Sequence, residues 1–98
     1  MATFISLVNL TQDGVREFKA SPDRGAKFKS MAQKVGVTVK DIYWTMGAYD
    51  AVIIMEAPDD ETATAVMLSL ASLGNVRTQT LRGFTSSEMQ KVISKAPG

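Results

Sequence analysis

The chain contains neither cysteine nor histidine among its 98 residues. Without cysteine it forms no disulfide, thiolate nucleophile or cysteine-ligated metal site. Without histidine it lacks the side chain that most often serves as a general base near neutral pH and most often binds metals. Any catalysis must use carboxylates, tyrosine, lysine, the backbone or a cofactor. The composition predicts neither a metal site nor a cofactor.

The chain also lacks a charge excess and a long apolar run. Lys and Arg number 11 against 10 Asp and Glu, which gives a formal net charge of +1 and no bias toward nucleic acid or anionic membranes. No apolar run approaches the ~20 residues that span a bilayer. Residues 1–10 have no basic segment of the kind that opens a signal peptide. We therefore expect a cytoplasmic protein that binds neither membranes nor nucleic acid.

What remains is an ordinary globular composition, 45% hydrophobic and 21% charged, with a length that fits one domain over residues 1–98. Hydrophobic patterns predict strands at residues 3–10, 37–46, 49–57 and 75–84. They predict helices at residues 12–35, with a break near Pro22, 58–73 and 85–95. The order β-α-β-β-α-β with an added helix indicates an α+β, ferredoxin-like fold. Right-handed crossovers then place the first and third strands at the centre of an antiparallel sheet.

Local signals mark where these elements begin, turn and face the core. Ser21 is a favourable N-cap followed by Pro22, Gly47-Ala48 suits a hairpin turn, and Thr85 with Glu88 forms a capping box. The apolar stripes of the two long helices are Phe28, Met31, Ala32 and Val35, and Ala63, Val66, Met67, Leu70 and Leu73.

The predicted sheet has no polar face. One face of the third strand carries Tyr49, Ala51, Ile53, Met55 and Ala57, and the other carries Val52 and Ile54. Two helices cover one face of a sheet only, and an exposed apolar face marks an interaction site. We therefore expect two sheets to pack face to face in a homodimer or higher oligomer. The alternative is that the C-terminal helix folds beneath the sheet and covers this face alone.

Three stretches of the chain resemble the bacterial GYD-domain family. They are IYWTMGAYDAV at residues 42–52, EAPDDE at residues 56–61 and LGNVRT at residues 73–78. The similarity extends over residues 2–95, and the one departure in the naming motif is Ala48, between Gly47 and Tyr49. The resemblance implies a ferredoxin-like α+β domain related to the dimeric α+β barrel proteins. It implies no particular activity.

Three aromatic residues, Tyr43, Trp44 and Tyr49, surround one hairpin. Tyr43 and Trp44 are neighbours on a strand and therefore point to opposite faces. An aromatic wall with polar tips suits a small apolar or aromatic ligand. We place this ligand between the sheet and the helices, beside either Tyr43 or Trp44. Packing in the core or in a dimer interface is the alternative role of these aromatics.

Polar residues near the same hairpin are candidates for orienting the ligand. Asp50 suits a buried base or, as the simpler role, an anchor that bonds hairpin amides at the Gly47-Ala48 turn. Arg77 and Arg82 face opposite ways on the fourth strand, where they pair with Asp50, bind an anion or remain solvated. Asn9 closes the first strand. The candidate ligand-binding residues are therefore Asn9, Tyr43, Trp44, Tyr49, Asp50 and Arg82.

Two charge clusters predict ordinary surface structure. Asp59, Asp60 and Glu61 begin a helix, where the helix dipole favours anions, and their differing directions argue against a metal site. The basic residues of the first helical region alternate with acids, which indicates a solvated face rather than a nucleic-acid site. They are Arg16, Lys19, Arg24, Lys27, Lys29 and Lys34.

The residues favour a homo-oligomeric module that binds a small apolar or aromatic molecule. The first alternative is a cofactor-independent enzyme like the monooxygenases and isomerases among the dimeric α+β barrels, whose pockets use Asn, Trp, Tyr and Arg. That alternative rests on analogy of fold. The second is a purely structural, assembly protein. A cavity lined by Trp44 or Tyr43 favours a ligand, whereas a filled interior favours assembly.

Overall fold

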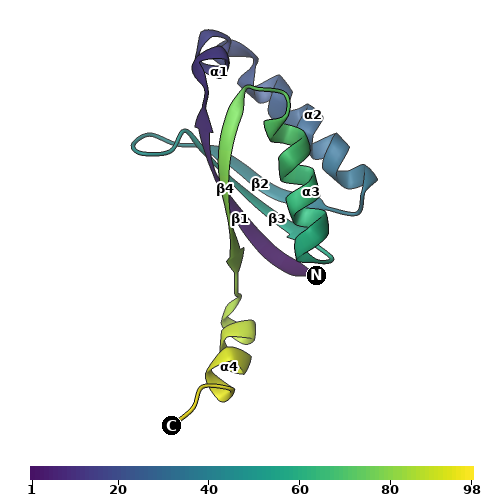
Figure 1. Ribbon diagram of the computed structural model, residues 1–98, viewed down its shortest axis with the longest axis vertical. Coiled ribbons are helices and arrows are strands. Elements are labelled where there is room, and N and C mark those ends of the chain that lie inside the picture. Colours follow the sequence, from purple (N-terminus) through teal and green to yellow (C-terminus); the bar gives the residue numbers. More distant parts are fainter.

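A four-stranded antiparallel sheet in the order β2-β3-β1-β4 is the centre of the computed structural model, which describes residues 1–98 (Figure 1). The strands are β1 (Ala2–Leu10), β2 (Thr38–Trp44), β3 (Ala51–Ala57) and β4 (Val76–Gly83). The first and third strands are central, as the right-handed crossovers predict. The α+β, ferredoxin-like fold expected from the sequence is therefore confirmed.

The first helical region consists of three segments instead of one kinked helix. They are α1 (Gln12–Arg16), the 3-10 turn η1 (Phe18–Ala20) and α2 (Ser21–Lys34). Ser21 is not the N-cap that the sequence suggested, because its amide already donates to the carbonyl of Phe18 in the 3-10 turn. Ala20 takes the cap position instead and makes no side-chain bond there.

The other two helices begin at strong caps. The α3 helix (Asp60–Ala71) starts after Asp59, whose carboxylate accepts a bond of 2.7 Å from the Thr62 amide. The α4 helix (Ser86–Ser94) starts with the expected capping box, in which Thr85 and Glu88 bond each other's amides at 3.2 and 2.9 Å. None of the helices has the length and apolar composition needed to cross a bilayer.

The link between β2 and β3 is a loop over residues 45–50, longer than the expected Gly47-Ala48 turn. The Thr45 amide donates to the carbonyl of Asp50 at 2.9 Å, and the Thr45 hydroxyl donates to the carbonyl of Tyr49 at 2.7 Å. These bonds join the two ends of the loop, so the pairing of β2 with β3 stops at Trp44 and Ala51, before Gly47 and Ala48. The third strand therefore begins at Ala51 instead of Tyr49.

The core lies between one face of the sheet and the helices α2 and α3. It consists of Phe4, Val8, Phe28, Ala32, Val37, Val39, Ala51, Ile53, Met55, Ala57, Ala63, Val66 and Met67. Strand members recur at every second residue and helix members at helical spacing, as the patterns predicted. Val35 and Leu73 were expected in the buried stripes but are exposed, because α2 ends at Lys34 and α3 at Ala71.

The opposite face of the sheet, which we call the open face, lies away from α2 and α3. Strand pairing places on it Ile5, Leu7, Tyr43, Val52, Ile54 and Leu81. The prediction that both faces of the central strands are apolar is therefore correct.

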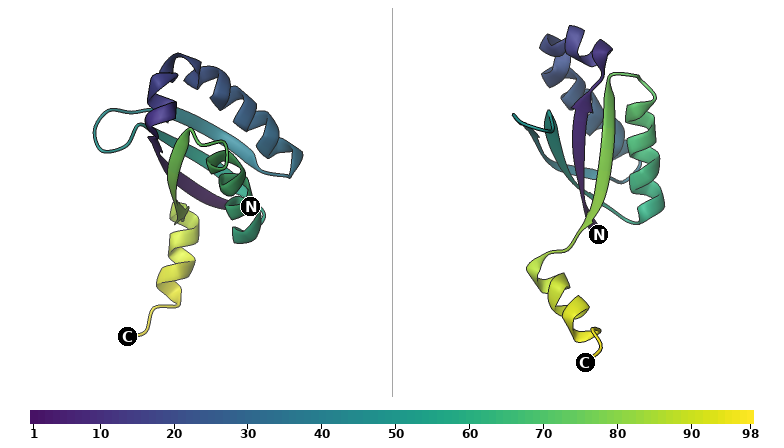
Figure 2. Two further views of the ribbon diagram at one scale, coloured as in Figure 1. Left: turned by 45° about the horizontal axis from the view of Figure 1, so that its top comes forward. Right: turned by 60° about the vertical axis from the view of Figure 1, so that its left-hand side comes forward.

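The α4 helix extends away from the rest of the fold (Figures 1 and 2). It has no buried residue, and the alternative in which it covers the open face is wrong. The Cα radius of gyration is 14.7 Å, against roughly 13 Å for a compact chain of about this length. The apolar residues Met89, Val92 and Ile93 of α4 are exposed, so two apolar surfaces of the chain lack an intramolecular partner.

Candidate functional site

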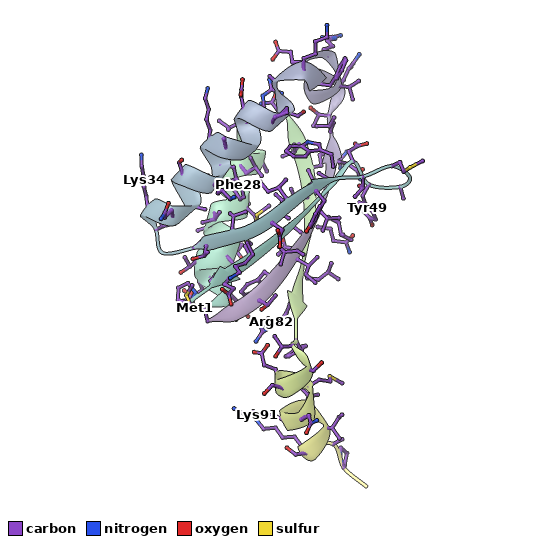
Figure 3. All side chains as sticks on the ribbon, turned by 180° about the vertical axis from the view of Figure 1, so that it is seen from behind. Met1, Phe28, Lys34, Tyr49, Arg82 and Lys91 are labelled. Atoms are coloured by element: carbon purple, nitrogen blue, oxygen red, sulfur yellow. The ribbon has the colours of Figure 1, made fainter.

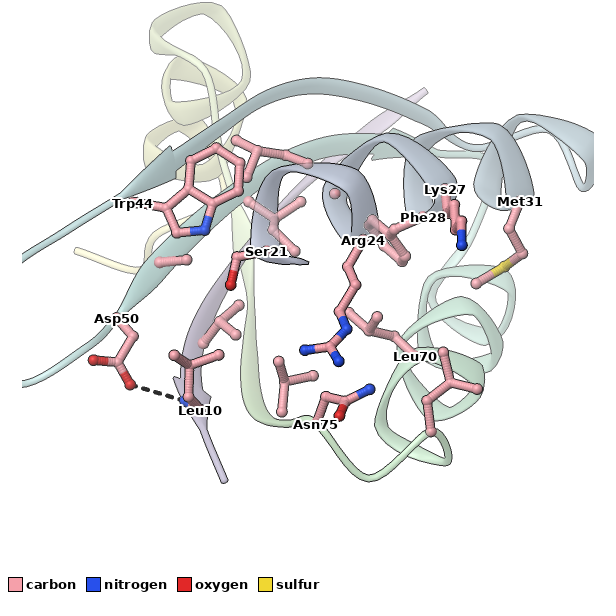
Figure 4. A pocket seen from close by; sticks show the side chains of 17 residues that line it. Leu10, Ser21, Arg24, Lys27, Phe28, Met31, Trp44, Asp50, Leu70 and Asn75 are labelled. Carbon is pink, nitrogen blue, oxygen red and sulfur yellow. Dashed lines mark hydrogen bonds between the residues drawn. The ribbon is translucent and has the colours of Figure 1, made fainter. Parts of the chain in front are cut away.

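A cavity of about 440 Å³ lies between α2 and the sheet, next to the C-terminal end of α3 (Figure 4). Eleven of its 17 lining residues are hydrophobic. Its volume falls within the range of small-molecule pockets, and an apolar lining with a few polar groups is their usual character. The cavity lies on the side of the sheet where the sequence placed a ligand.

Trp44 forms part of the cavity wall, whereas its neighbour Tyr43 lies on the open face. The indole of Trp44 packs against α2 at Gly25, where an added Cβ would lie 3.4 Å from the ring. That distance is an ordinary van der Waals contact, so the ring lies close to the helix and still leaves room for a methyl group. About half of Trp44 stays exposed, so its indole is accessible to a ligand as well as packed on the helix.

Asp50 also lines the cavity, and its carboxylate is engaged. Oδ2 accepts a hydrogen bond of 2.8 Å from the backbone amide of Leu10, at the end of β1. The Asp50 amide donates to the carbonyl of Val8 at 2.8 Å. The sequence suggested that Asp50 bonds the amides of its own hairpin, whereas its side chain bonds β1.

Arg24 and Asn75 are the polar residues that approach each other across the cavity (Figure 4). Arg24 extends from α2 toward Asn75 at the start of β4, and 27% of its side chain is exposed. Its Nη2 lies 2.5 Å from Oε2 of Glu17, while Nη1 is buried without a hydrogen-bond partner. The expectation that Arg24 belongs to a solvated basic face is wrong.

The remaining candidate residues do not line this cavity. The hydroxyl of Tyr49 donates to Gln79 at 3.3 Å, on the open face, which corrects the prediction that Tyr49 shares a face with Ala51. The alternation of a strand does not apply to Tyr49, because it belongs to the loop. Asn9 pairs with Arg77 in the register of β1 and β4.

Arg82 lies near the start of α4 (Figure 3) and pairs with Glu88 at 3.3 Å. Its guanidinium stacks on the ring of Phe84 at 4.6 Å and lies 5.7 Å from that of Phe4. Arg82 therefore neither pairs with Asp50 nor lines the cavity. Arg82 instead joins β4 to the first turn of α4.

Sequence reasoning missed Arg24, Ser21 and Asn75 as lining residues. The sequence did contain a signal for Arg24. Phe28 and Met31 follow it at helical spacing, so Arg24 lies on the same helix face as the apolar stripe. A charged residue within such a stripe is a candidate for a pocket. Asn75 had no comparable signal, since its place depends on how β4 follows α3.

A second hollow of about 500 Å³ lies between α3 and β4, where only four of 10 lining residues are hydrophobic. It is less suited to an apolar ligand. No group of three or more Asp and Glu side chains is placed to hold a metal ion. The cavity beside Trp44 is therefore the better candidate site.

The profile of the family described as "GYD domain" matches residues 4–93. The chain belongs to the GYD domain family. A relative from Thermus thermophilus is 37% identical over 90 residues, which are 91% of this chain and 95% of the relative. That relative is named "Glutamine synthetase and cystathionine beta-lyase binding protein".

Two solved structures resemble this GYD domain in fold. TTHA0845 from Thermus thermophilus has a TM-score of 0.58 and 24% identity, over 88% of this chain and 96% of that one. MtbAldR has a TM-score of 0.59 and 17% identity, over 87% of this chain and 54% of that one. At these identities the likeness concerns the fold alone.

The residues that name the GYD family brace one loop in this structure. Gly47 adopts a φ of +100°, which side-chain-bearing residues rarely adopt. Tyr49 reaches Gln79 of β4, and Asp50 bonds Leu10 of β1. The motif thus ties the β2–β3 loop to the two other strands, and through Asp50 it fixes one wall of the cavity.

Proposed function

We propose that this GYD domain is a homodimeric or higher-order module that binds a small, largely apolar or aromatic molecule in the cavity beside Trp44. The observation that carries the proposal is the cavity of about 440 Å³ with 11 hydrophobic residues among 17. The well-packed interior of a folded domain has few voids larger than a water molecule. A cavity of this size beside an accessible indole is suited to a ligand.

Binding is favoured over catalysis by the state of the polar groups in the wall. Asp50 is the carboxylate among the lining residues, and its Oδ2 already accepts the amide of Leu10. Its Oδ1 makes no hydrogen bond, but the chain has no histidine or cysteine to act beside it as base or nucleophile. The structural bond to Leu10 supports an anchor, and the enzyme alternative therefore has the weaker support.

Ligand binding is testable with two variants of adjacent residues. Phenols, quinols, flavonoids and small lactones are screened for an increase in melting temperature. A ligand at a hundredfold excess over its Kd stabilises the fold by about 2.7 kcal/mol. Trp44→Leu should lose the ligand-dependent increase, whereas Tyr43→Leu, on the other face of the sheet, should retain it. If no compound stabilises the wild-type protein, or if Tyr43→Leu alone loses the increase, the cavity is not the site.

The homodimer is supported by the apolar open face. Four half-buried aliphatic residues of the two central strands lie there, with Tyr43 and Leu81 more exposed beside them. A second copy is the simplest cover, because identical apolar sheets pack face to face at about 10 Å with twofold symmetry. The exposed stripe of Met89, Val92 and Ile93 on α4 would add apolar surface to the same assembly.

A second candidate function is binding of a metabolic enzyme. It is favoured by the relative that shares 37% identity over 91% of this chain and is named for binding glutamine synthetase and cystathionine beta-lyase. The test is size-exclusion chromatography of this chain mixed with glutamine synthetase or cystathionine beta-lyase from the organism that supplies this chain. Co-elution that is lost when α4 is made polar by Val92→Glu and Ile93→Glu supports this function. Separate elution of both mixtures contradicts it.

A further inference from the structure

Arg24 lines the cavity, and one nitrogen of its guanidinium makes no hydrogen bond. Nη1 is buried and has no hydrogen-bond partner, while Nη2 is held by Glu17 at 2.5 Å. Figure 4 shows the side chain lying along the cavity, directed toward Asn75. A buried N–H without an acceptor destabilises the folded chain, and more so when the group is charged. An acceptor supplied by a ligand would remove that penalty.

The existing ion pair does not compete strongly for Arg24. The side chain of Glu17 is 68% exposed and lies in the turn between α1 and η1. Exposed ion pairs contribute little, because water and salt screen them. A carboxylate inside the apolar cavity would meet Arg24 in a less polar medium, where the attraction between the charges is stronger.

We infer that the ligand of this cavity is a small carboxylate with an aromatic or branched apolar tail, and that Arg24 binds its carboxylate. This inference rests on the proposed ligand-binding function and adds the chemical class. A planar guanidinium matches the two oxygens of a carboxylate. The tail lies against Trp44, Ile42 and Ile53, which line the same cavity.

A single negative charge suits this wall better than a phosphate. Most of the lining is hydrophobic, so each additional charge would lose its hydration with no partner to replace it. The carboxylate of Asp50, in the same wall, would also repel a more highly charged group. Arg24 therefore determines specificity for a monoanion, and the apolar lining determines its tail.

The test uses the only tryptophan of the chain, Trp44, which lines the cavity and reports occupancy by its fluorescence. Phenylpropionate is titrated against phenylpropanol, and isocaproate against its alcohol, so that each pair shares its apolar tail and differs in the head group, a carboxylate or a neutral hydroxyl. In the wild type each acid should bind about tenfold tighter than its alcohol, as a hydrogen-bonded charge pair predicts. Arg24→Gln should bring acid and alcohol to equal affinity without weakening the alcohol.

Two further variants separate a specific contact from a general effect of charge. Glu17→Gln removes the competing carboxylate and should tighten the acids several-fold while leaving the alcohols unchanged. Lys29→Gln makes the same charge change as Arg24→Gln at an exposed position of α2 outside the lining, and should change nothing. Retained binding of the alcohols shows that each variant is folded.

The outcomes distinguish this inference from the proposed function. If acids and alcohols bind the wild type equally, the cavity binds ligands but Arg24 does not select carboxylates, and the inference alone is overturned. The same holds if Arg24→Gln keeps the preference for acids. If Trp44 responds saturably to neither member of either pair, the inference is overturned, and the thermal-shift screen decides the ligand-binding proposal separately.

Discussion

The carboxylate of Asp50 and the backbone amide of Leu10 are joined by a hydrogen bond of 2.8 Å between residues 40 positions apart. Asp50 ends the loop before β3, and Leu10 is the last residue of β1. The bond therefore joins the end of β1 to the loop before β3, at a point where both residues line the cavity. It also gives the aspartate of the GYD motif a partner in β1 that the sequence did not reveal.

Asp50→Asn should preserve most of this closure, because the amide oxygen can still accept from Leu10. Asp50→Ala leaves the Leu10 amide without an acceptor and should cost about 1–3 kcal/mol of unfolding free energy. Urea denaturation of the three proteins measures both effects. Equal, large losses in the two variants would show that the negative charge itself is required.

Two glycines should respond oppositely to alanine. A Cβ at Gly14 would lie 2.1 Å from the carbonyl oxygen of Asn75, so Gly14→Ala must displace backbone and should cost about 1–3 kcal/mol. A Cβ at Gly25 would meet Trp44 at 3.4 Å, an ordinary contact. Gly25→Ala in α2 should therefore gain up to about 1 kcal/mol from helix propensity. If the urea denaturation midpoints of the two variants shifted in the same direction, this account would be contradicted.

The open face should control the oligomeric state. Leu81 is 42% exposed on this face, and Leu68 is 65% exposed on α3. Wild-type protein at micromolar concentration should scatter light as at least twice the chain mass of 10.6 kDa. Leu81→Glu should yield the monomer because it places a charge in the interface. The same substitution at Leu68 should leave the mass unchanged.

A wild-type mass of 10.6 kDa would refute the homodimer. A stable dimer in both variants would instead show that the interface does not include Leu81 of β4. The exposed stripe of α4 would then be the next surface to alter.

The first turn of α4 should weaken in acid. The bond from the Thr85 amide holds the pKa of Glu88 below its ordinary value of 4.5, and Arg82 contributes in the same direction. Because the folded pKa is lower than the unfolded one, ionised Glu88 stabilises the cap above pH 4.5. That contribution disappears as the pH falls through the lowered pKa.

The amide proton shift of Thr85, followed by NMR from neutral to strongly acidic pH, should report this loss. Glu88→Gln should abolish the dependence, since the glutamine amide does not titrate in this range. A transition of equal size in that variant would assign the effect to another group.

Local patterns in the sequence predicted the order of the strands and main helices and most of the residues that these elements bury. Phe4, Ser6 and Val8 are buried at every second residue of β1, and this local alternation fixes which face of a strand meets the helices. The capping box of Thr85 and Glu88 is likewise complete within four consecutive residues. Such features depend on neighbours in the chain, and the patterns therefore predicted them.

Contacts between segments far apart in the chain could be found only in the folded structure. Tyr49 lies outside the strand alternation because the loop bonds delay the start of β3 to Ala51, and Asp50 bonds β1 instead of its own hairpin. Arg24 entered the cavity wall because α3 and β4 place Asn75 opposite α2 (Figure 4). The direction of α4 depends on the chain after β4, which no periodicity specifies. In each case the partner lies outside the local segment, so the free energy that selects the arrangement is not encoded in a local pattern.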